Sequence, residues 1–308
     1  MKTKKQNPPK GGKLTKEQIK WLNKCTEGTW KLNPQTGLVD VDGRFDCNDR
    51  GLSDFKGVRF GVVKGDFDCG SNLLTSLVGA PQKVEVDFWC SYNHLTSLEG
   101  APREVGGSFS CEDNQLTSLV GAPQKVGGDF WCEDNRLTSL VGAPREVGED
   151  FTCDDNQLTS LEGAPQKVGG GFYCQDNQLT SLVGAPEKVG VDFDCGSNLL
   201  TSLVGAPQKV EGDFWCSYNH LTSLEGAPRE VGGDFYCDDN PVPERTLESI
   251  FSLMKKGASY EEVLRRKWKR YSRETKLLLY RAEYQWIPQE EHKMLSALNK
   301  VNSVLKWI

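Results

Sequence analysis

Ten of the eleven cysteines of this chain stand at a nearly fixed interval. Nine of them are 21 residues apart and the tenth, Cys47, precedes the next by 22; the ten are Cys47, Cys69, Cys90, Cys111, Cys132, Cys153, Cys174, Cys195, Cys216 and Cys237. A Phe lies two residues before each, and from Cys69 onward an Asn lies three residues after each. Leu-Thr-Ser-Leu and Gly-Ala-Pro segments each occur eight times in the same step. A period of this length predicts stacked copies of one structural unit.

The spacing within one copy predicts which side chains point inward. Phe-x-Cys has the two-residue period of a β-strand, so Phe and Cys face the core while the residue between them faces outward. The chain bends after the strand, and an inward Asn amide can satisfy the backbone groups that this bend leaves buried. The Gly of Gly-Ala-Pro permits a tight turn, and the Pro favours an extended return.

The cysteines themselves are predicted to be core residues. On stacked parallel strands they would stand ~4.8 Å apart, as a row of small, buried side chains. A zinc site needs four converging ligands and usually a Cys-x-x-Cys pair, which the sequence lacks. Disulfides would break the equivalence of the copies, and we expect Cys25, outside the array, to be core as well. Calcium bound between stacked residues such as Asp134, Asp155 and Asp176 is a less favoured alternative, because calcium-binding β-rolls repeat every nine residues. We therefore predict no metal and no cofactor.

The frame F-x-C-x-x-N-x-L-T-S-L-x-G-A-P resembles the leucine-rich repeat, whose signature is L-x-L-x-x-N-x-L. The resemblance covers about residues 45–240, and the Leu-Thr-Ser-Leu segment before a Pro is similar to the 20-residue repeats of bacterial effectors. With the helical segment that precedes it, the chain looks like bacterial and phage proteins of this kind. The resemblance implies a repeat solenoid with a parallel β-sheet on one face, mostly irregular return segments, and partner binding on the sheet face.

The sequence predicts four regions. Residues 1–13 read as a disordered basic lead, and residues 14–44 as an N-terminal cap made of a helix, with Thr15 as its N-cap, and a hairpin. Residues 45–240 form the solenoid of about ten repeats. Residues 241–308 read as a C-terminal helical cap or tail, with helices near 244–256, 259–284 and 288–306.

Charge and aromatic residues point to the outward side of the Phe-x-Cys strands as the functional surface. The chain carries −6 overall, but residues 45–240 carry −18 between basic ends. Exposed tryptophans among carboxylates suit a protein partner with a basic surface. The candidate partner-binding residues are Trp89, Trp131, Tyr173, Trp215, Tyr236, Asp87, Asp129, Glu133, Asp150, Asp154 and Asp213. Alternatively, acidity and aromatics merely suit an exposed, soluble strand.

Two other functions remain open. Arg265, Arg266, Lys269 and Arg270, with Trp268 and Tyr271 between them, suit a nucleic-acid contact or a solvated helix face. Tryptophan platforms also stack on sugars, which would make this a carbohydrate-binding surface or virion protein. We expect no enzyme, because no nucleophile, phosphate-binding or zinc-protease motif occurs and no cysteine follows Cys237 to serve as a ubiquitin-ligase nucleophile.

The array also holds a larger copy. Residues 66–107 recur almost unchanged as residues 192–233, an offset of six repeats of 21 residues.

The chain has no apolar run long enough for a membrane span and no apolar segment after its basic start. We therefore expect a cytoplasmic protein that binds no membrane, inside a bacterial host if phage-encoded.

Overall fold

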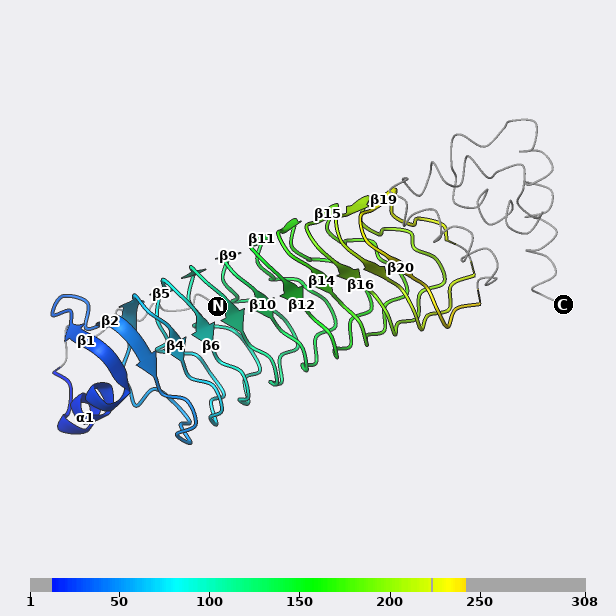
Figure 1. Cartoon of the computed structure of the whole chain (residues 1–308). Helices are drawn as coiled ribbons and strands as arrows, with labels where there is room; N and C mark the ends of the chain where they lie inside the picture. Colours follow the sequence, from blue (N-terminus) through cyan, green and yellow to red (C-terminus); the bar gives the residue numbers. More distant parts are fainter. Residues whose placement is uncertain (1–12, 223, 242–308) are drawn as a thin grey trace, which may run out of the picture. The chain divides into compact units, whose positions relative to one another are not determined.

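The computed structural model describes residues 13–222 and 224–241. The predicted helices between 244 and 306 and the basic residues Arg265, Arg266, Lys269 and Arg270 lie outside the described residues. The chain divides into two compact units, Met1–Glu149 and Asp150–Ile308, called unit 1 and unit 2 below. Each is a parallel β-solenoid built from 21-residue turns, which confirms the predicted repeat-solenoid fold (Figure 1).

Every regular turn contributes two strands of two residues. The first holds the Phe of the repeat: β4 (Phe67–Asp68), β6 (Phe88–Trp89), β8 (Phe109–Ser110) and β10 (Phe130–Trp131) in unit 1, and β12 (Phe151–Thr152), β14 (Phe172–Tyr173), β16 (Phe193–Asp194), β18 (Phe214–Trp215) and β20 (Phe235–Tyr236) in unit 2. Equivalent residues pair in parallel, Phe67 with Phe88 and Phe193 with Phe214. We call these rows the Phe ladders.

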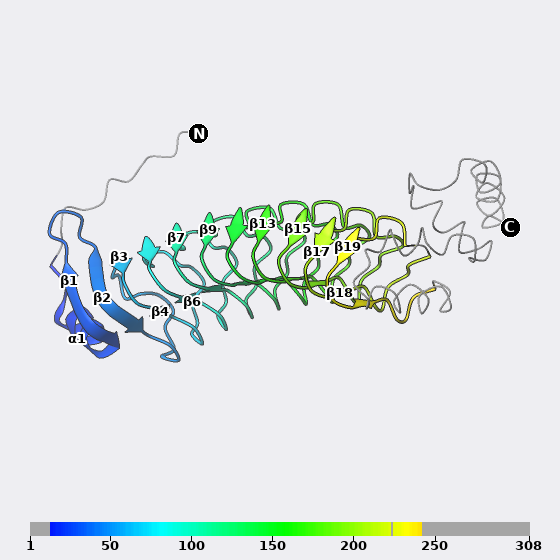
Figure 2. The ribbon, with the colours of Figure 1, turned by 45° about the horizontal axis from the view of Figure 1, so that its top comes forward.

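The second strand lies in the return segment and ends with the Val of the repeat. Its copies are β5 (Lys83–Val84), β7 (Glu104–Val105), β9 (Lys125–Val126) and β11 (Glu146–Val147) in unit 1, and β13 (Lys167–Val168), β15 (Lys188–Val189), β17 (Lys209–Val210) and β19 (Glu230–Val231) in unit 2. Figure 2 shows these strands as a separate row within each unit. The return segments are otherwise irregular, as predicted; in these short strands Val84 pairs with Val105 and Val189 with Val210.

The core of each unit is a set of stacked identical side chains. Phe67 and Phe88 stack with ring centroids 5.5 Å apart and planes 5° apart, and Phe172 and Phe193 do the same at 5.5 Å and 10°. The array cysteines and both leucines of each Leu-Thr-Ser-Leu segment are buried beside them. Because a single turn exposes this apolar face, stacking supplies most of the burial on which stability depends.

A helix and a hairpin precede the first turn of unit 1. Helix α1 (Lys16–Cys25) begins with a capping box in which Thr15 accepts from the Gln18 N–H and the Gln18 side chain accepts from the Thr15 N–H. Strands β1 (Thr26–Leu32) and β2 (Val39–Asp46) pair antiparallel, and β2 continues in parallel with β3 (Phe60–Val63). Trp21 packs edge-on against Phe45 at 5.3 Å, so the helix covers the first ring of the stack.

The Gly of Gly-Ala-Pro is required by its conformation and by its neighbour. Gly100 has a φ of +96°, and a Cβ there would lie 2.8 Å from the carbonyl group of Leu77 in the preceding turn. Among the described residues, none of the helices combines the length and apolarity of a membrane span.

Candidate functional site on the Phe ladders

The cysteine thiols hold neighbouring turns together. Within both units, Sγ–H groups of the array donate to the carbonyl of the residue that precedes the next cysteine, as from Cys90 to Ser110 at 3.2 Å and from Cys174 to Asp194 at 3.1 Å. All eleven cysteines are buried, and none of them forms a disulfide. Burial raises the pKa of the Cys90 and Cys174 thiols well above the ordinary value, which keeps them neutral and unreactive. The prediction of core cysteines is confirmed.

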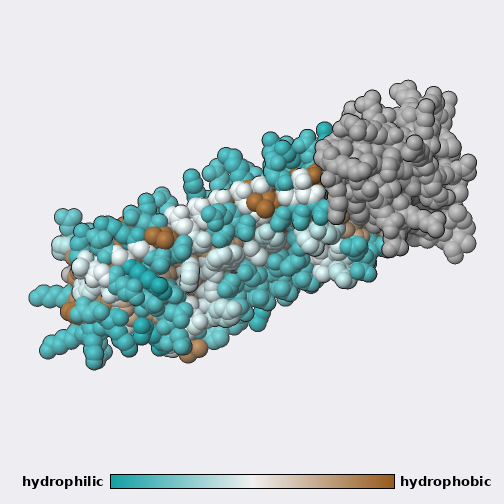
Figure 3. Space-filling model, in the orientation of Figure 1, coloured by the Kyte–Doolittle hydropathy of each residue, from teal (hydrophilic) through white to brown (hydrophobic). Residues whose placement is uncertain are grey.

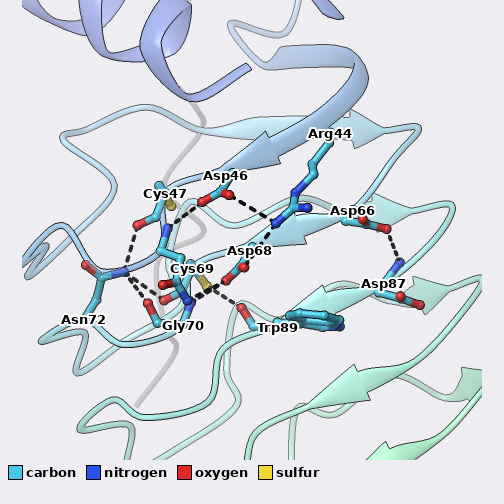
Figure 4. Close-up of polar contacts among 11 residues, drawn as sticks. Arg44, Asp46, Cys47, Asp66, Asp68, Cys69, Gly70, Asn72, Asp87 and Trp89 are labelled. Carbon is cyan, nitrogen blue, oxygen red and sulfur yellow. Dashed lines mark hydrogen bonds and ion pairs between the residues drawn. The ribbon is translucent and has the colours of Figure 1, made fainter. Parts of the chain in front are cut away.

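The repeated asparagines form the predicted ladder. The Asn93 Nδ2 lies 3.1 Å from each of the carbonyl oxygens of Cys69, Cys90 and Ser91, and its Oδ1 accepts from the Leu74 N–H at 2.9 Å. Figure 4 shows the equivalent contacts of Asn72. The Asn93 side chain therefore links its own turn to the preceding one and contacts four buried backbone groups.

The residue just before each Asn adopts a left-handed backbone conformation. Asp, Ser and Tyr occupy this position, with φ between 49° and 55°. Short polar residues tolerate this conformation, whereas a bulky one there is unusual. Tyr92 and Tyr218 are nevertheless present, at φ of 53° and 55°, and their side chains are 56% and 64% exposed. The sequence prediction omitted these two tyrosines. They could have been found from the sequence, because the position before the repeated Asn is Asp or Ser in the other repeats.

The aspartates that precede the Phe residues bind the backbone of the next turn. Asp87 accepts from the Ser108 N–H at 2.7 Å, Asp150 from the Gly171 N–H at 2.6 Å, and Asp213 from the Asp234 N–H at 2.6 Å. The Asp129 N–H donates to the Ser108 hydroxyl of the preceding turn at 3.1 Å. These predicted partner-binding residues are half-buried and serve the fold, while their charge still contributes to the acidic surface.

The five predicted aromatic residues lie in different environments. Trp89 and Trp215 are 41% and 36% exposed, and Trp131 is half-buried. In unit 2 the rings of Trp215 and Tyr236 stack at 3.8 Å, and the Tyr236 hydroxyl donates to Asp234 at 3.3 Å. The Tyr173 ring lies over Gly171, where a Cβ would come within 2.5 Å of its hydroxyl oxygen. Tyr173 is thus folded onto the surface, and Trp89 and Trp215 project most.

Carboxylates of unit 2 crowd together around Tyr173. Asp154 is buried and accepts from the Gln175 N–H at 2.9 Å. Burial and the nearby Asp194 raise the pKa of Asp154 to about 7, and burial raises the pKa of Asp194 to about 6. Burial and four surrounding aspartates raise the pKa of Tyr173 to about 12. In unit 1, the predicted site residue Glu133 is half-buried.

In unit 1 an arginine lies among the aspartates of the Phe ladder. The Arg44 Nη2 lies 3.1 Å from the Asp46 Oδ2 and 3.5 Å from the Asp68 Oδ2. Figure 4 shows Trp89 on the turn that follows Asp68, with its ring seen edge-on. The guanidinium therefore pairs with two successive aspartates of the Phe ladder in unit 1, the second of which lies beside Trp89 in the strand register, and the prediction missed this arrangement.

The face drawn in Figure 3 is mostly hydrophilic or intermediate in hydropathy. On the face drawn in Figure 3, apolar side chains are isolated spots among hydrophilic ones. Within 13–222 and 224–241, no group of three or more His, Cys, Asp or Glu side chains is arranged to hold a metal ion. No protein-family model matches the chain, and no curated protein matches it in sequence.

Proposed function

We propose that the chain is a non-enzymatic protein-binding module that recognises a basic partner protein through the acidic, aromatic-bearing Phe ladders. The observation that carries the proposal is the pairing of an exposed tryptophan with an exposed left-handed tyrosine on one turn, in both units. Trp89 with Tyr92, and Trp215 with Tyr218, flank a buried cysteine in each case.

The backbone gives a reason to connect these tyrosines with binding. A left-handed conformation costs a non-glycine residue about 1–2 kcal/mol, and Asp or Ser fills the position in the other turns. Burial does not repay the cost, because both tyrosine rings are exposed. Exposed Trp and Tyr that are held on rigid strands are the side chains that most often dominate binding energy at protein interfaces.

The charges indicate the sign of the partner. Residues 45–240 carry −18, and in unit 2 burial, with added repulsion from neighbouring carboxylates, raises the pKa of Asp154 and Tyr173. A basic partner would relieve this repulsion, and such complementarity accelerates association and weakens with salt. The leucine-rich-repeat resemblance points to the same face.

The test is capture of a partner from a lysate of the cell that expresses the chain, followed by purification of the captured protein and measurement of its Kd. We expect the double variant Trp89→Ala, Trp215→Ala to weaken binding at least about tenfold, the effect of losing one interface anchor. The matched control is Val78→Ala, Val204→Ala, which trims exposed apolar side chains of the same duplicated segments at a different position. Equal affinity of both double variants would contradict the proposal.

A further inference from the structure

The duplicated segments place the same residues in two different surroundings. Residues 66–107 and 192–233 differ only at Val86, which is Gly212 in the second copy. Both copies pair an aspartate with a tryptophan of the next turn, Asp68 with Trp89 in unit 1 and Asp194 with Trp215 in unit 2. The residues before the copies are not duplicated, so the two aspartates meet different partners.

In unit 1 the aspartate has an arginine. Arg44 places its Nη2 3.5 Å from the Asp68 Oδ2, and the Asn48 Nδ2 donates to the Asp68 Oδ1 at 3.2 Å. The Gly70 N–H adds a third contact at 3.0 Å. The unit 1 copy therefore holds a guanidinium against the aspartate that lies beside Trp89 in the strand register (Figure 4).

In unit 2 the equivalent positions supply no cation. Gly171 stands in place of Arg44, and Gln175, in place of Asn48, directs its Nε2 to Asp154 at 3.3 Å. Among the described residues, the Asp194 carboxylate retains one hydrogen bond, from the Gly196 N–H at 2.8 Å. Burial together with Asp176 and Asp192 raises the pKa of this carboxyl to about 6, as expected for an anion without a cation beside it.

Among the described residues, the neighbouring tryptophan has an aromatic ring stacked on one of its faces only. Tyr236 stacks on one side of the Trp215 ring at 3.8 Å, and Tyr236 belongs to the turn that follows Trp215. The other side of the ring is therefore turned toward the turn of Asp194. A planar guanidinium can stack on an indole and donate to a carboxylate at the same time, whereas a lysine ammonium is a compact point charge.

We propose that Asp194 and Trp215 form a binding site for an arginine side chain of the partner protein. This inference rests on the proposed function and names the chemistry that the partner must bring. Arg44 pairs with the aspartate of the unit 1 copy, whereas Gly171 and the Tyr173 ring above it bring no cation to Asp194, so the unit 2 copy is the one that recognises the partner.

The first experiment follows the tryptophans by ¹⁹F NMR in the full chain labelled with fluorotryptophan, with Trp215 assigned through Trp215→Phe. The probes are acetyl-Gly-Arg-Gly-amide and the same peptide with Lys. We expect the Trp215 resonance to move saturably with the arginine peptide and to require a higher concentration of the lysine peptide. Asp194→Asn should weaken the arginine response about tenfold, the loss of one charge-assisted contact. Asp68→Asn is the matched control and should leave the response unchanged.

The second experiment tests whether the unit 1 copy binds the arginine peptide once its internal arginine is removed. Removing the internal guanidinium with Arg44→Ala should make the Trp89 resonance respond to the arginine peptide as well. The proposal is overturned if Asp194→Asn binds the peptide as the wild type does, or if both peptides bind equally. It is also overturned if replacing Arg265, Arg266, Lys269 and Arg270 by Ala shifts the Trp215 resonance without any peptide, because the chain would then fill its own site. Partner capture that depends on Trp215 but not on Asp194 would leave the proposed function standing.

Discussion

At the scale of the residue, the repeated Asn is the side chain on which most backbone groups depend. The Asn114 Nδ2 contacts the carbonyl oxygens of Cys90 and Cys111 at 3.1 Å, and its Oδ1 accepts from the Leu95 N–H at 2.9 Å. Replacing it by Leu leaves these buried groups without partners, each at about 1–3 kcal/mol. We expect Asn114→Leu to lower the free energy of unfolding by at least about 3 kcal/mol in urea titration. The neighbouring Gln115→Leu is the control and should change it by less than about 0.5 kcal/mol.

The buried Asp154 gives a pH dependence with a definite sign. Its pKa is raised from about 4 in the unfolded chain to about 7 in the fold. The folded chain thus binds a proton that the unfolded chain has released, so stability from this group is complete below pH 4 and is lost as pH rises to 7. We expect Asp154→Asn to remove this dependence and to stabilise unit 2 by on the order of 1–3 kcal/mol at pH 7.5. Thermal melts of variant and wild type at pH 5 and 7.5 measure the difference; parallel curves would contradict the prediction.

At the scale of the element, the turn after the cysteine shows a conflict between stability and the proposed binding. Asn tolerates the left-handed conformation that Tyr218 adopts at φ 55°. We therefore expect Tyr218→Asn to raise the free energy of unfolding by about 1 kcal/mol while weakening partner capture. Tyr236→Phe, which keeps the ring stacked on Trp215, is the control for a general loss of aromatic surface. A destabilised Tyr218→Asn would show that the ring supports the fold.

The elements also show what a sequence can predict. Phe, Cys and Asn recur at fixed offsets, so their inward direction followed from the strand period, and the structure places them as expected. The second strand was missed because Lys-Val or Glu-Val is too short to show a period of two. The roles of Asp87 and Asp213 were missed because a carboxylate that binds a backbone N–H of the next turn has the same sequence as one that faces solvent. Arg44 was missed because its acceptors lie on two turns.

At the scale of the whole molecule, the exact repeat length is what keeps the turns in register. Each turn contacts its neighbours through the Phe ladder, the Val strand and the Asn side chain, so stability is expected to follow a sum of nearest-neighbour terms. Removing one complete repeat from unit 1 should then lower the free energy of unfolding by one such nearest-neighbour term. Deleting residues 112–132 joins Cys111 to Glu133 and restores the sequence Cys-Glu-Asp-Asn without a seam.

We expect this 21-residue deletion to lower the Tm by less than about 5 °C. The 20-residue deletion of 112–131 retains Cys132 as an extra residue between the strand and the Asn, which displaces Asn135 from the groups of the preceding turn that Asn114 reaches, the Cys90 carbonyl and the Leu95 N–H. A one-residue slip also turns inward side chains outward, so this variant should lose more than about 10 °C. Differential scanning calorimetry compares the two deletions directly. Equal losses would mean that chain length, and not register, governs the stability of the solenoid.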